Sequence, residues 1–553
     1  MFKSTDNVNF VPTKVISIKP EAQVNYNPKT MNQLRWLIPQ YIGFFDPRSL
    51  YMKYNIKMSG RGHAKPDWRA GVHSLWRDVR IQDGSGSAEL EMLQDYNVQT
   101  ANWWEWTTNE SINNKRSLFE GRSETSDVDE QIYYGASGDW SAGAVTDTFE
   151  RKQLEIQQPI YSGILGGERV FPVAATKGLR VQMTLDDLRR SLVFNDSLGI
   201  QESGGGQNQY CESDTDKLIN TDIKTAIDTT FTVTVRDPAS STDSLGVNLN
   251  AVPYNNNPFD IGDLLYTSNQ ATGTDEQALG VITGFNNDAG KLVISYIPNR
   301  ALPDTGLASA HAVGDRLYVK AGDRINGVTT ANVPAASAAL AAQGISYELS
   351  NIEMLVLQVQ PPEGYVNAMM SQVSSSTGLN LDFRSYTLYR FNLNTINGLT
   401  NQLIPANQRR AYSIFSVPLS IKSQNELIRS SLVGIPDNAQ NYQYVFRGNL
   451  IPDRPIRTER FSQVVAHPNA LALVETEKAL VNANYGVRNL VGSADRFVVA
   501  RAFSKYNQIF DLSAGDLALR VEYEGATQEK LYEHFVQYIR RINIGAGGTV
   551  VSF

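Results

Sequence analysis

The chain has a single cysteine, Cys211, among 553 residues. One thiol cannot form an intrachain disulfide, so we expect the chain to fold in a reducing compartment. No apolar run is long enough to predict a transmembrane helix, and residues 1–14 lack the apolar core of a secretory signal. The sequons at Asn109 and Asn195 are therefore expected to stay unglycosylated.

Patterns typical of catalysis or metal binding are also missing. The triple glycine at 204–206 lacks the Lys-Ser/Thr pair of a phosphate-binding loop, and "DGSGSA" at 83–88 predicts a hairpin turn rather than a nucleophile elbow. The five histidines show no spacing typical of a metal site. They are His63, His73, His311, His467 and His534. Carboxylate pairs such as Asp186-Asp187 do not by themselves indicate acid–base chemistry. We therefore predict no enzyme activity, no catalytic residue, no metal and no cofactor.

Charge of one sign is not in large excess. The net charge of −7 does not suggest a dedicated nucleic-acid binder. The chain is instead rich in Tyr, Phe, Asn, Gln, Ser, Thr and Gly, a composition typical of strands and long loops rather than helix bundles. Its length predicts two or three domains.

Alternation of apolar and polar residues predicts most of the strands. "GLRVQMTL" at 178–185 and "DLALRVEYEG" at 516–525 each place apolar residues on one face, as in half-buried antiparallel strands. Each is followed by a short stretch with helical character, at 186–192 and at 527–535. Further elements are expected as a hairpin at 79–93, strands at 352–365 and 496–503, and helices at 93–107 and 469–486.

One phrase occurs twice. Residues 37–57 read "LIPQYIGFFDPRSLYMKYNIK", and residues 403–422 read "LIPANQRRAYSIFSVPLSIK". In both, Leu-Ile-Pro leads into a strand-like stretch, and the strands at 178–185 and 516–525 follow downstream in the same order. The recurrence predicts two related β domains in one chain.

Short strands separated by Asn, Asp, Gly and Pro between 223 and 343 predict a small β unit inserted into the first domain. The strand at 352–365 would return to complete that domain. The predicted parts are an N-terminal arm at 1–13, a first domain at 14–222 plus 344–370, the insertion at 223–343, a flexible linker at 371–378 and a second domain at 379–553. The stretches 107–150 and 202–214 are predicted to be exposed loops.

Eight-stranded sandwiches with two Greek keys accommodate this order of elements. On residues 32–60, 70–98 ("AGVHSLWRDVRIQDGSGSAELEMLQDYNV") and 449–456 ("NLIPDRPI"), the chain resembles the double jelly-roll major capsid proteins of the adenovirus–PRD1 lineage. The likeness is greatest to those of virophages, polinton-like viruses and adintoviruses. The predicted fold class is all-β, with two eight-stranded jelly rolls, short helices and a β-rich loop insertion in the first.

The resemblance implies a major capsid protein, or hexon, of a double-stranded DNA virus. Three chains would form a homotrimer whose six jelly rolls give a pseudo-hexagonal capsomer that tiles an icosahedral capsid. The implied location is the virion, after assembly inside the host cell. The implied partners are the chain itself, neighbouring capsomers, and penton and minor capsid proteins, without sequence-specific nucleic acid. The insertion would form an outward tower, and the termini, with Lys3, Lys14 and Lys19, would lie near the base.

Seven residues are candidates for contacts between subunits. They are Asn449, Pro452, Asp453, Arg454, Pro455, Trp103 and Trp104. The segment "NLIPDRPI" either fixes the edge of the second domain against a neighbouring subunit or jelly roll, or is an ordinary rigid turn. The Trp cluster at 103–106 is either a sugar-stacking platform or part of a core or subunit contact. Two other functions therefore stay open, a carbohydrate-binding or glycoside-active β protein and a minor capsid or spike-like protein.

Overall fold

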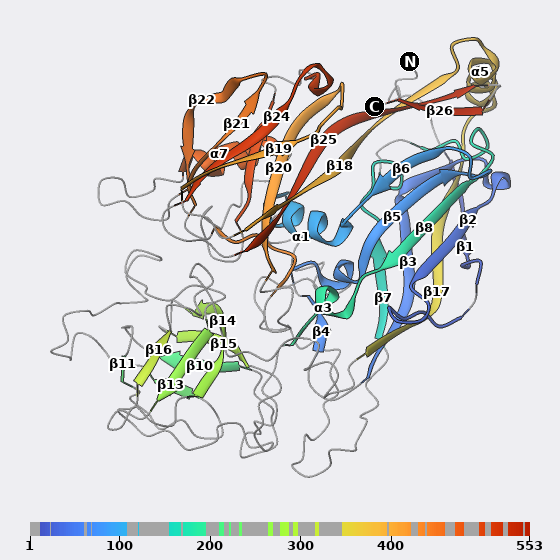
Figure 1. Ribbon diagram of the computed structural model, residues 1–553. Coiled ribbons are helices and arrows are strands. Elements are labelled where there is room, and N and C mark those ends of the chain that lie inside the picture. Colours follow the sequence, from blue (N-terminus) through green and yellow to red (C-terminus); the bar gives the residue numbers. More distant parts are fainter. Residues whose placement is uncertain are drawn as a thin grey trace.

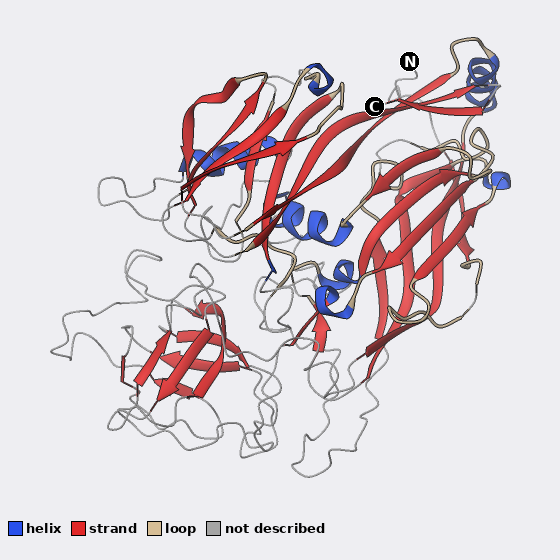
Figure 2. Ribbon diagram, in the orientation of Figure 1, coloured by secondary structure: helices blue, strands red, loops and turns tan. Residues whose placement is uncertain are grey.

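Two β-sandwiches stand next to each other, and a third, smaller sheet lies apart from them (Figures 1 and 2). The structure is a computed structural model. It describes residues 11–22, 24–59, 64–67, 69–107, 120, 154–166, 170–194, 346–394, 398–421, 430–436, 439–458, 470–480, 497–503, 510–523, 529–545 and 548–552, together with seven strands between 210 and 319.

The first sandwich consists of two four-stranded sheets, with strand orders β1-β17-β3-β7 and β2-β8-β5-β6. Its strands are β1 (Val11–Ile18), β2 (Gln33–Ile38), β3 (Phe45–Ser59), β5 (Trp76–Asp83), β6 (Glu89–Leu93), β7 (Leu154–Pro159), β8 (Leu179–Leu185) and β17 (Ser346–Gln360). Lettered B to I in chain order, the two sheets read B-I-D-G and C-H-E-F. This order is that of a jelly roll.

The second sandwich repeats that order. Its sheets are β18-β25-β20-β23 and β19-β24-β21-β22, again B-I-D-G and C-H-E-F, and β26 (Gly548–Ser552) pairs additionally with β25. The strands are β18 (Leu379–Leu393), β19 (Gly398–Ile404), β20 (Ala411–Ser420), β21 (Ala439–Phe446), β22 (Asn449–Arg457), β23 (Val499–Ala502), β24 (Leu517–Tyr523) and β25 (Lys530–Gly545). The predicted fold class, two eight-stranded jelly rolls, is confirmed.

The repeated Leu-Ile-Pro phrase lies at the same place in both domains, where strand C ends and the chain turns into strand D. Residues 37–38 of β2 pair with residues 179–180 of β8. Residues 403–404 of β19 pair in the same way with residues 517–518 of β24. The two recurring sequence features are therefore hydrogen-bonded neighbours in each domain, which explains why they recur together.

A helix follows strand F in both domains, as predicted. These helices are α1 (Tyr96–Thr107) and α7 (Ala470–Ala479). Proline ends β17 because it cannot donate to a strand ladder, and α5 (Glu363–Ser374) begins directly after Pro361 and Pro362. The short elements are α3 (Leu188–Ser191), η1 (Gln40–Ile42), η2 (Gly71–Leu75), η6 (Leu512–Ala514) and the strand pair β4 (Ala64–Pro66) with β9 (Leu192–Phe194). Within the described parts of the chain, no helix is long and apolar enough to cross a membrane.

The third sheet lies in the connection between strands H and I of the first domain. Its seven strands have the order β11-β16-β13-β14-β15-β10-β12. They are β10 (Tyr210–Asp214), β11 (Thr221–Asp222), β12 (Thr232–Thr234), β13 (Leu264–Ser268), β14 (Gln277–Asn286), β15 (Lys291–Tyr296) and β16 (Arg316–Val319). Strands β12 to β16 lie where short strands were predicted. The prediction of a loop at 202–214 is wrong at β10, because pairing with β12 and β15 decides its structure rather than its own polar sequence.

Three further predictions fail for physical reasons. The predicted helical stretch 527–535 is strand from Lys530 on, because β25 is a central strand that is covered on both faces and therefore lacks apolar alternation. The segment 449–456 is not a turn, because it forms β22 at the edge of its sheet, where proline is tolerated. The expected flexible linker begins inside α5, so residues 371–374 are helical.

Strand β2 shows how the sequence pattern becomes a core. It buries Leu34, Trp36 and Ile38 and exposes Gln33 and the residues alternating with it. Each side chain therefore points either into the sandwich or to solvent, as the two-residue period of a strand requires.

This alternation predicts opposite outcomes for two leucines on one strand. Leu34 is fully buried, and Leu37 is 38% exposed. We expect Leu34→Ala to lower the unfolding free energy by about 2–5 kcal/mol, because it leaves a cavity, whereas Leu37→Ala should cost less than about 1 kcal/mol. Urea unfolding followed by tryptophan fluorescence measures both. Equal losses would contradict this assignment of faces.

Candidate functional site

A cluster of three buried carboxyl groups and the two arginines that contact them lies where the two jelly rolls meet. We call it the junction cluster, and its members are Asp95, Asp186, Arg190, Arg390 and Glu533. Among the residues that the structure describes, no three His, Cys, Asp or Glu side chains gather as a metal site.

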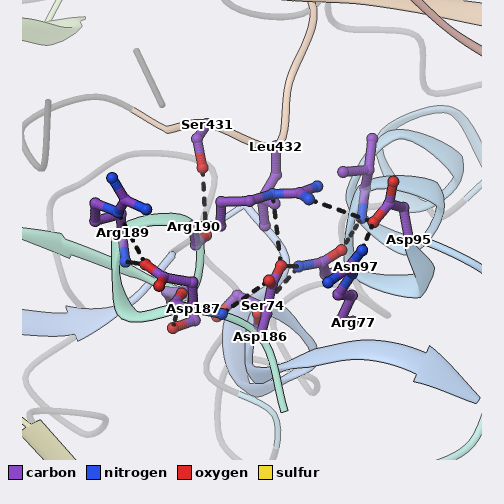
Figure 3. A network of polar contacts seen from close by, with 12 residues as sticks. Ser74, Arg77, Asp95, Asn97, Asp186, Asp187, Arg189, Arg190, Ser431 and Leu432 are labelled. Carbon is purple, nitrogen blue, oxygen red and sulfur yellow. Dashed lines mark hydrogen bonds and ion pairs between the residues drawn. The ribbon is translucent and has the colours of Figure 1, made fainter. Parts of the chain in front are cut away.

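The cluster is built from the ends and middles of five elements. Asp95 lies in the turn from β6 to α1, where its φ of 44° is in the left-handed region. Asp186 follows β8, and Arg190 lies on α3. Arg390 of β18 and Glu533 of β25 are partners in the ladder of the second domain. Figure 3 shows the side chain of Arg190 between Asp95 and Asp186.

Two arginines connect the carboxylates of both domains. Arg190 donates from Nη1 to Asp95 Oδ1 at 3.3 Å, its Nε lies 3.5 Å from Asp186 Oδ2, and its Nη2 lies 4.0 Å from Glu533 Oε1. Arg390 donates from Nη2 to Asp95, and its Nε lies 3.5 Å from Glu533 Oε1. Each arginine therefore contacts a carboxyl group of its own domain and one of the other domain.

The two acids that the arginines share have pKa values moved in opposite directions. Burial, with the nearby charge of Asp95, raises the pKa of Glu533 well above its usual range. Burial acts to raise the pKa of Asp95 too, but the hydrogen bond with Glu533 and the charges of Arg190 and Arg390 lower it to about 2. These opposite shifts favour the ionised form of Asp95 and the protonated form of Glu533.

Neutral and charge-assisted hydrogen bonds extend the junction along β6. Glu91 is fully buried, and its Oε1 accepts from Ser385 Oγ of β18 at 2.9 Å and from the Gly163 backbone N–H at 3.0 Å. Burial raises the pKa of Glu91. A Cβ at Gly163 would lie 2.0 Å from Arg384 O, so only glycine permits this close approach of the two domains.

Further bonds run from second-domain side chains to first-domain backbone. Tyr386 Oη donates to Gln94 O at 3.1 Å, and Arg540 Nη2 donates to Glu89 O at 2.9 Å. From α1, Asn102 Nδ2 donates to Leu432 O of the second domain at 2.7 Å. The strand F side and helix α1 of the first domain thus cover the B and I strands of the second.

A second buried network lies inside the first domain. His73 is fully buried, its Nε2 lies 2.9 Å from Glu120 Oε2, and its Nδ1 lies 2.9 Å from Tyr96 Oη and from Gln158 Nε2. Glu120 belongs to the stretch 107–150 that was predicted to be exposed, yet it is only 6% exposed. That prediction is wrong at this residue, because the His73 network holds its carboxyl group inside, and the rest of 108–153 lies outside the described residues.

The two histidines that the structure describes, His73 and His534, lie in different domains. His534 is fully buried against Ser416 Oγ at 2.8 Å, and burial lowers its pKa to about 3, so its ring is neutral. His63, His311 and His467 lie outside the described residues.

The predicted subunit contacts lie on two elements, β22 and α1. Asn449, Pro452, Asp453, Arg454 and Pro455 all lie on the edge strand β22, where Asn449 and residues 453–455 are exposed. Trp103 is half-buried on α1, with its ring centroid 5.8 Å from that of Tyr161. The side chain of Trp104 lies outside the described residues. Contacts of these residues with other subunits stay a prediction.

Sequence patterns did not predict the junction cluster. Its members are spread from residue 95 to residue 533, and each is locally an ordinary polar residue in a turn, a helix or a strand. Asp186 stood out only as half of the pair Asp186-Asp187. The sequence gives no signal at Glu533 either, because the stretch 530–539 also contains Lys530, His534 and Gln537.

Comparison with known proteins finds likeness at the level of structure. No family model matches the sequence, and no curated protein matches it. The chain is similar to the Faustovirus major capsid protein, with 8% identity and a TM-score of 0.49 over 99% of this chain and 92% of that one. It is similar to a chain of the Sputnik virophage structure, with 9% identity and a TM-score of 0.44 over 100% and 90%. It is similar to the mavirus major capsid protein, with 8% identity and a TM-score of 0.35 over 100% and 93%.

Two neighbouring arginines test the junction cluster. Arg190→Leu leaves buried carboxyl groups without their cation and should lower the unfolding free energy by about 3–5 kcal/mol. Arg189→Leu, which loses only an exposed pair with Asp187, should cost less than about 1 kcal/mol. Thermal unfolding measures both. A loss for Arg189→Leu as large as that for Arg190→Leu would rule out the special role of the buried cation.

The raised pKa of Glu533 predicts a pH effect of definite sign. Its unfolded pKa is about 4.3, so the contribution of Glu533 to stability falls as pH rises from there through the higher folded pKa. Glu533→Gln keeps the shape of the protonated acid without titrating. Its thermal midpoint relative to wild type should therefore rise as pH increases above about 4.3. A difference that does not change with pH would contradict the assignment.

Proposed function

We propose that the chain is a major capsid protein that forms pseudo-hexagonal homotrimeric capsomers in the icosahedral shell of a double-stranded DNA virus. The observation that carries the proposal is the pair of jelly rolls with one strand order, held together in a fixed arrangement by buried polar contacts. The role proposed is structural, and the place of action is the virion.

The count of domains supports this role. Each chain supplies two similar sandwiches, so three chains supply six, arranged with threefold symmetry and a nearly sixfold outline. A six-sided unit packs into the hexagonal nets from which icosahedral shells are made. Closed symmetric assembly from one repeated contact is the usual route to such oligomers.

The placement of the third sheet supports an outward tower. In Figure 1 it lies at the opposite end of the molecule from α5 and β26. A subunit of a shell has one outer and one inner end. The third sheet and the end with α5 and β26 are suited to these two positions because they lie at opposite ends of the molecule. We propose that the third sheet faces outward and that α5 and β26 face the interior, where minor capsid proteins would bind.

The junction cluster fits a subunit that must keep its shape under lattice contacts. Buried ion pairs contribute little net stability but penalise arrangements in which one partner is left alone. A hinge between the two sandwiches would blur the six-sided outline. The arginine-bridged junction acts against such a hinge.

Size and shape of the purified full-length chain test the proposal. We expect a particle of three times the 61.3 kDa chain mass by light scattering, a six-lobed outline in negative stain, and hexagonal sheets at high concentration. A minor capsid or spike protein would form trimers without such sheets. A monomer at high concentration that binds a defined glycan would instead favour the carbohydrate-binding alternative and overturn the proposal.

A further inference from the structure

The core of the second jelly roll contains a layer of polar side chains, to which six neighbouring strands contribute one residue each. We call it the polar layer. Its members are Tyr389, His534 and Ser416, which pair in this order across β18, β25 and β20, and Gln402, Leu519 and Tyr444, which pair across β19, β24 and β21. A hydrogen bond of 2.9 Å between Ser416 Oγ and Tyr444 Oη places the two rows at the same level of the sandwich.

The corresponding layer of the first jelly roll is apolar apart from one indole N–H. Gln402 and Trp36 each stand directly before Leu-Ile-Pro. His534 and Met354 each lie four residues before the residue that pairs with the first residue of strand D. The ladders supply the other members, so the first-domain layer consists of Ile18, Met354, Met52, Trp36, Val181 and Ile81. Polar side chains are therefore not required by the fold at this level.

A chain of hydrogen bonds fixes the tautomer of His534. A carbonyl oxygen only accepts, so the Tyr444 hydroxyl donates to Val499 O at 3.3 Å. Tyr444 Oη then accepts from the hydroxyl of Ser416, and Ser416 Oγ accepts from His534 Nδ1 at 2.8 Å. Burial lowers the pKa of His534 to about 3, so at neutral pH the ring carries one proton, on Nδ1. Its Nε2 atom therefore presents a lone pair.

Four polar atoms in and beside the polar layer have no hydrogen-bond partner among the described residues. They are His534 Nε2, Gln402 Nε2, Gln402 Oε1 and Gln408 Oε1. His534 and Gln402 are fully buried, and Gln408, which is 2% exposed, donates from Nε2 to Tyr389 Oη at 2.8 Å. Because Nδ1 of His534 contacts Ser416 on β20, Nε2 is directed away from β20. The strand orders place β18 and β19, with Tyr389 and Gln402, on that other side.

The chemistry of these atoms indicates what they bind. Buried polar groups in proteins are nearly always hydrogen-bonded, and internal water serves those that no side chain reaches. His534 Nε2 and the two Oε1 atoms accept hydrogen bonds, whereas Gln402 Nε2 donates, so the ligand must both donate and accept. None of the six layer residues is charged, which favours a neutral ligand. A cation would be opposed by the amide N–H groups of Gln402.

We propose that the polar layer of the second jelly roll binds ordered water through His534 Nε2 and the side-chain amides of Gln402 and Gln408. The water donates to Nε2 and to the Oε1 atoms, and it accepts from Gln402 Nε2. Water then connects the two sheets by hydrogen bonds at the level where the first jelly roll uses apolar contact. The site lies within one domain of one chain, so it does not depend on the proposed capsomer.

The sign of a stability change tests the proposal in the full-length chain. With water bound, Gln402→Leu removes its hydrogen bonds and should lower the thermal midpoint of the second domain by about 2–4 °C, as expected for one buried hydrogen bond in a domain of this length. If the amide were simply unpaired, the same change would remove an unsatisfied group and raise the midpoint. Asn401→Leu, at an exposed position of the same strand, is the control and should change little. An unchanged or raised midpoint for Gln402→Leu overturns the proposal.

A double-mutant cycle tests whether His534 and Gln402 share the ligand. His534→Met introduces the residue that the first domain has at this position. If both side chains hold the same water, the double variant should lose less than the sum of the two single losses, because either change already disrupts the site. Additive losses would show that the two side chains act separately.

A map of the wild-type chain at a resolution that shows water gives the direct test. Density should lie within hydrogen-bond distance of His534 Nε2 and of the Gln402 amide, and it should be absent from the double variant. A site without density overturns the proposal. An anomalous scattering signal at this point, matched by metal in mass spectrometry, would overturn water as the ligand.

Discussion

The arrangement of the molecule depends on the neutralisation of buried carboxyl groups where the two jelly rolls meet. Arg190 and Arg390 each reach acids of both domains, so a rotation of one sandwich on the other would separate the buried carboxyl groups of Asp95 and Glu533 from these arginines. Such a contact specifies an orientation more than it adds stability. Gly163, which has no side chain, and the backbone acceptors along β6 then allow the two domains to approach each other closely.

The parts of the fold that sequence predicts are those with local causes. Strands β8 and β24 alternate because each has one buried and one solvated face, and the turns after residues 38 and 404 follow proline. Strand β25 has the same place in its domain as β17, but it lies under the first domain. Its outer face is buried, its alternation disappears, and its sequence looks helical at 527–535. The packing of β25 against the first domain therefore explains both the burial of its outer face and the wrong prediction of a helix at 527–535.

The junction could not be predicted because it is assembled from residues with no sequence relation to one another. Asp95 owes its position to a left-handed turn, Arg190 to a helix of one turn, and Glu533 to a ladder partner more than 140 residues away. The edge strand β22 gave a partial signal. Its two prolines predict a rigid segment. A rigid turn and an edge strand to which no further strand can pair both fit that prediction, so the prolines alone do not distinguish them.

The long connection between strands H and I has a consequence for how this fold changes over time. It leaves the first domain through β9, which is paired to β4, and returns at β17, so both of its ends are held by ladders that do not depend on what lies between them. Because the entropy of closing a loop grows only by about 0.6 kcal/mol for each doubling of its length, the sandwich is nearly indifferent to the size of what is inserted there. The whole excursion can therefore change in length and sequence while every strand of the two sandwiches keeps its register, and under the proposed outward placement this would exchange the surface that a host or an antibody meets first.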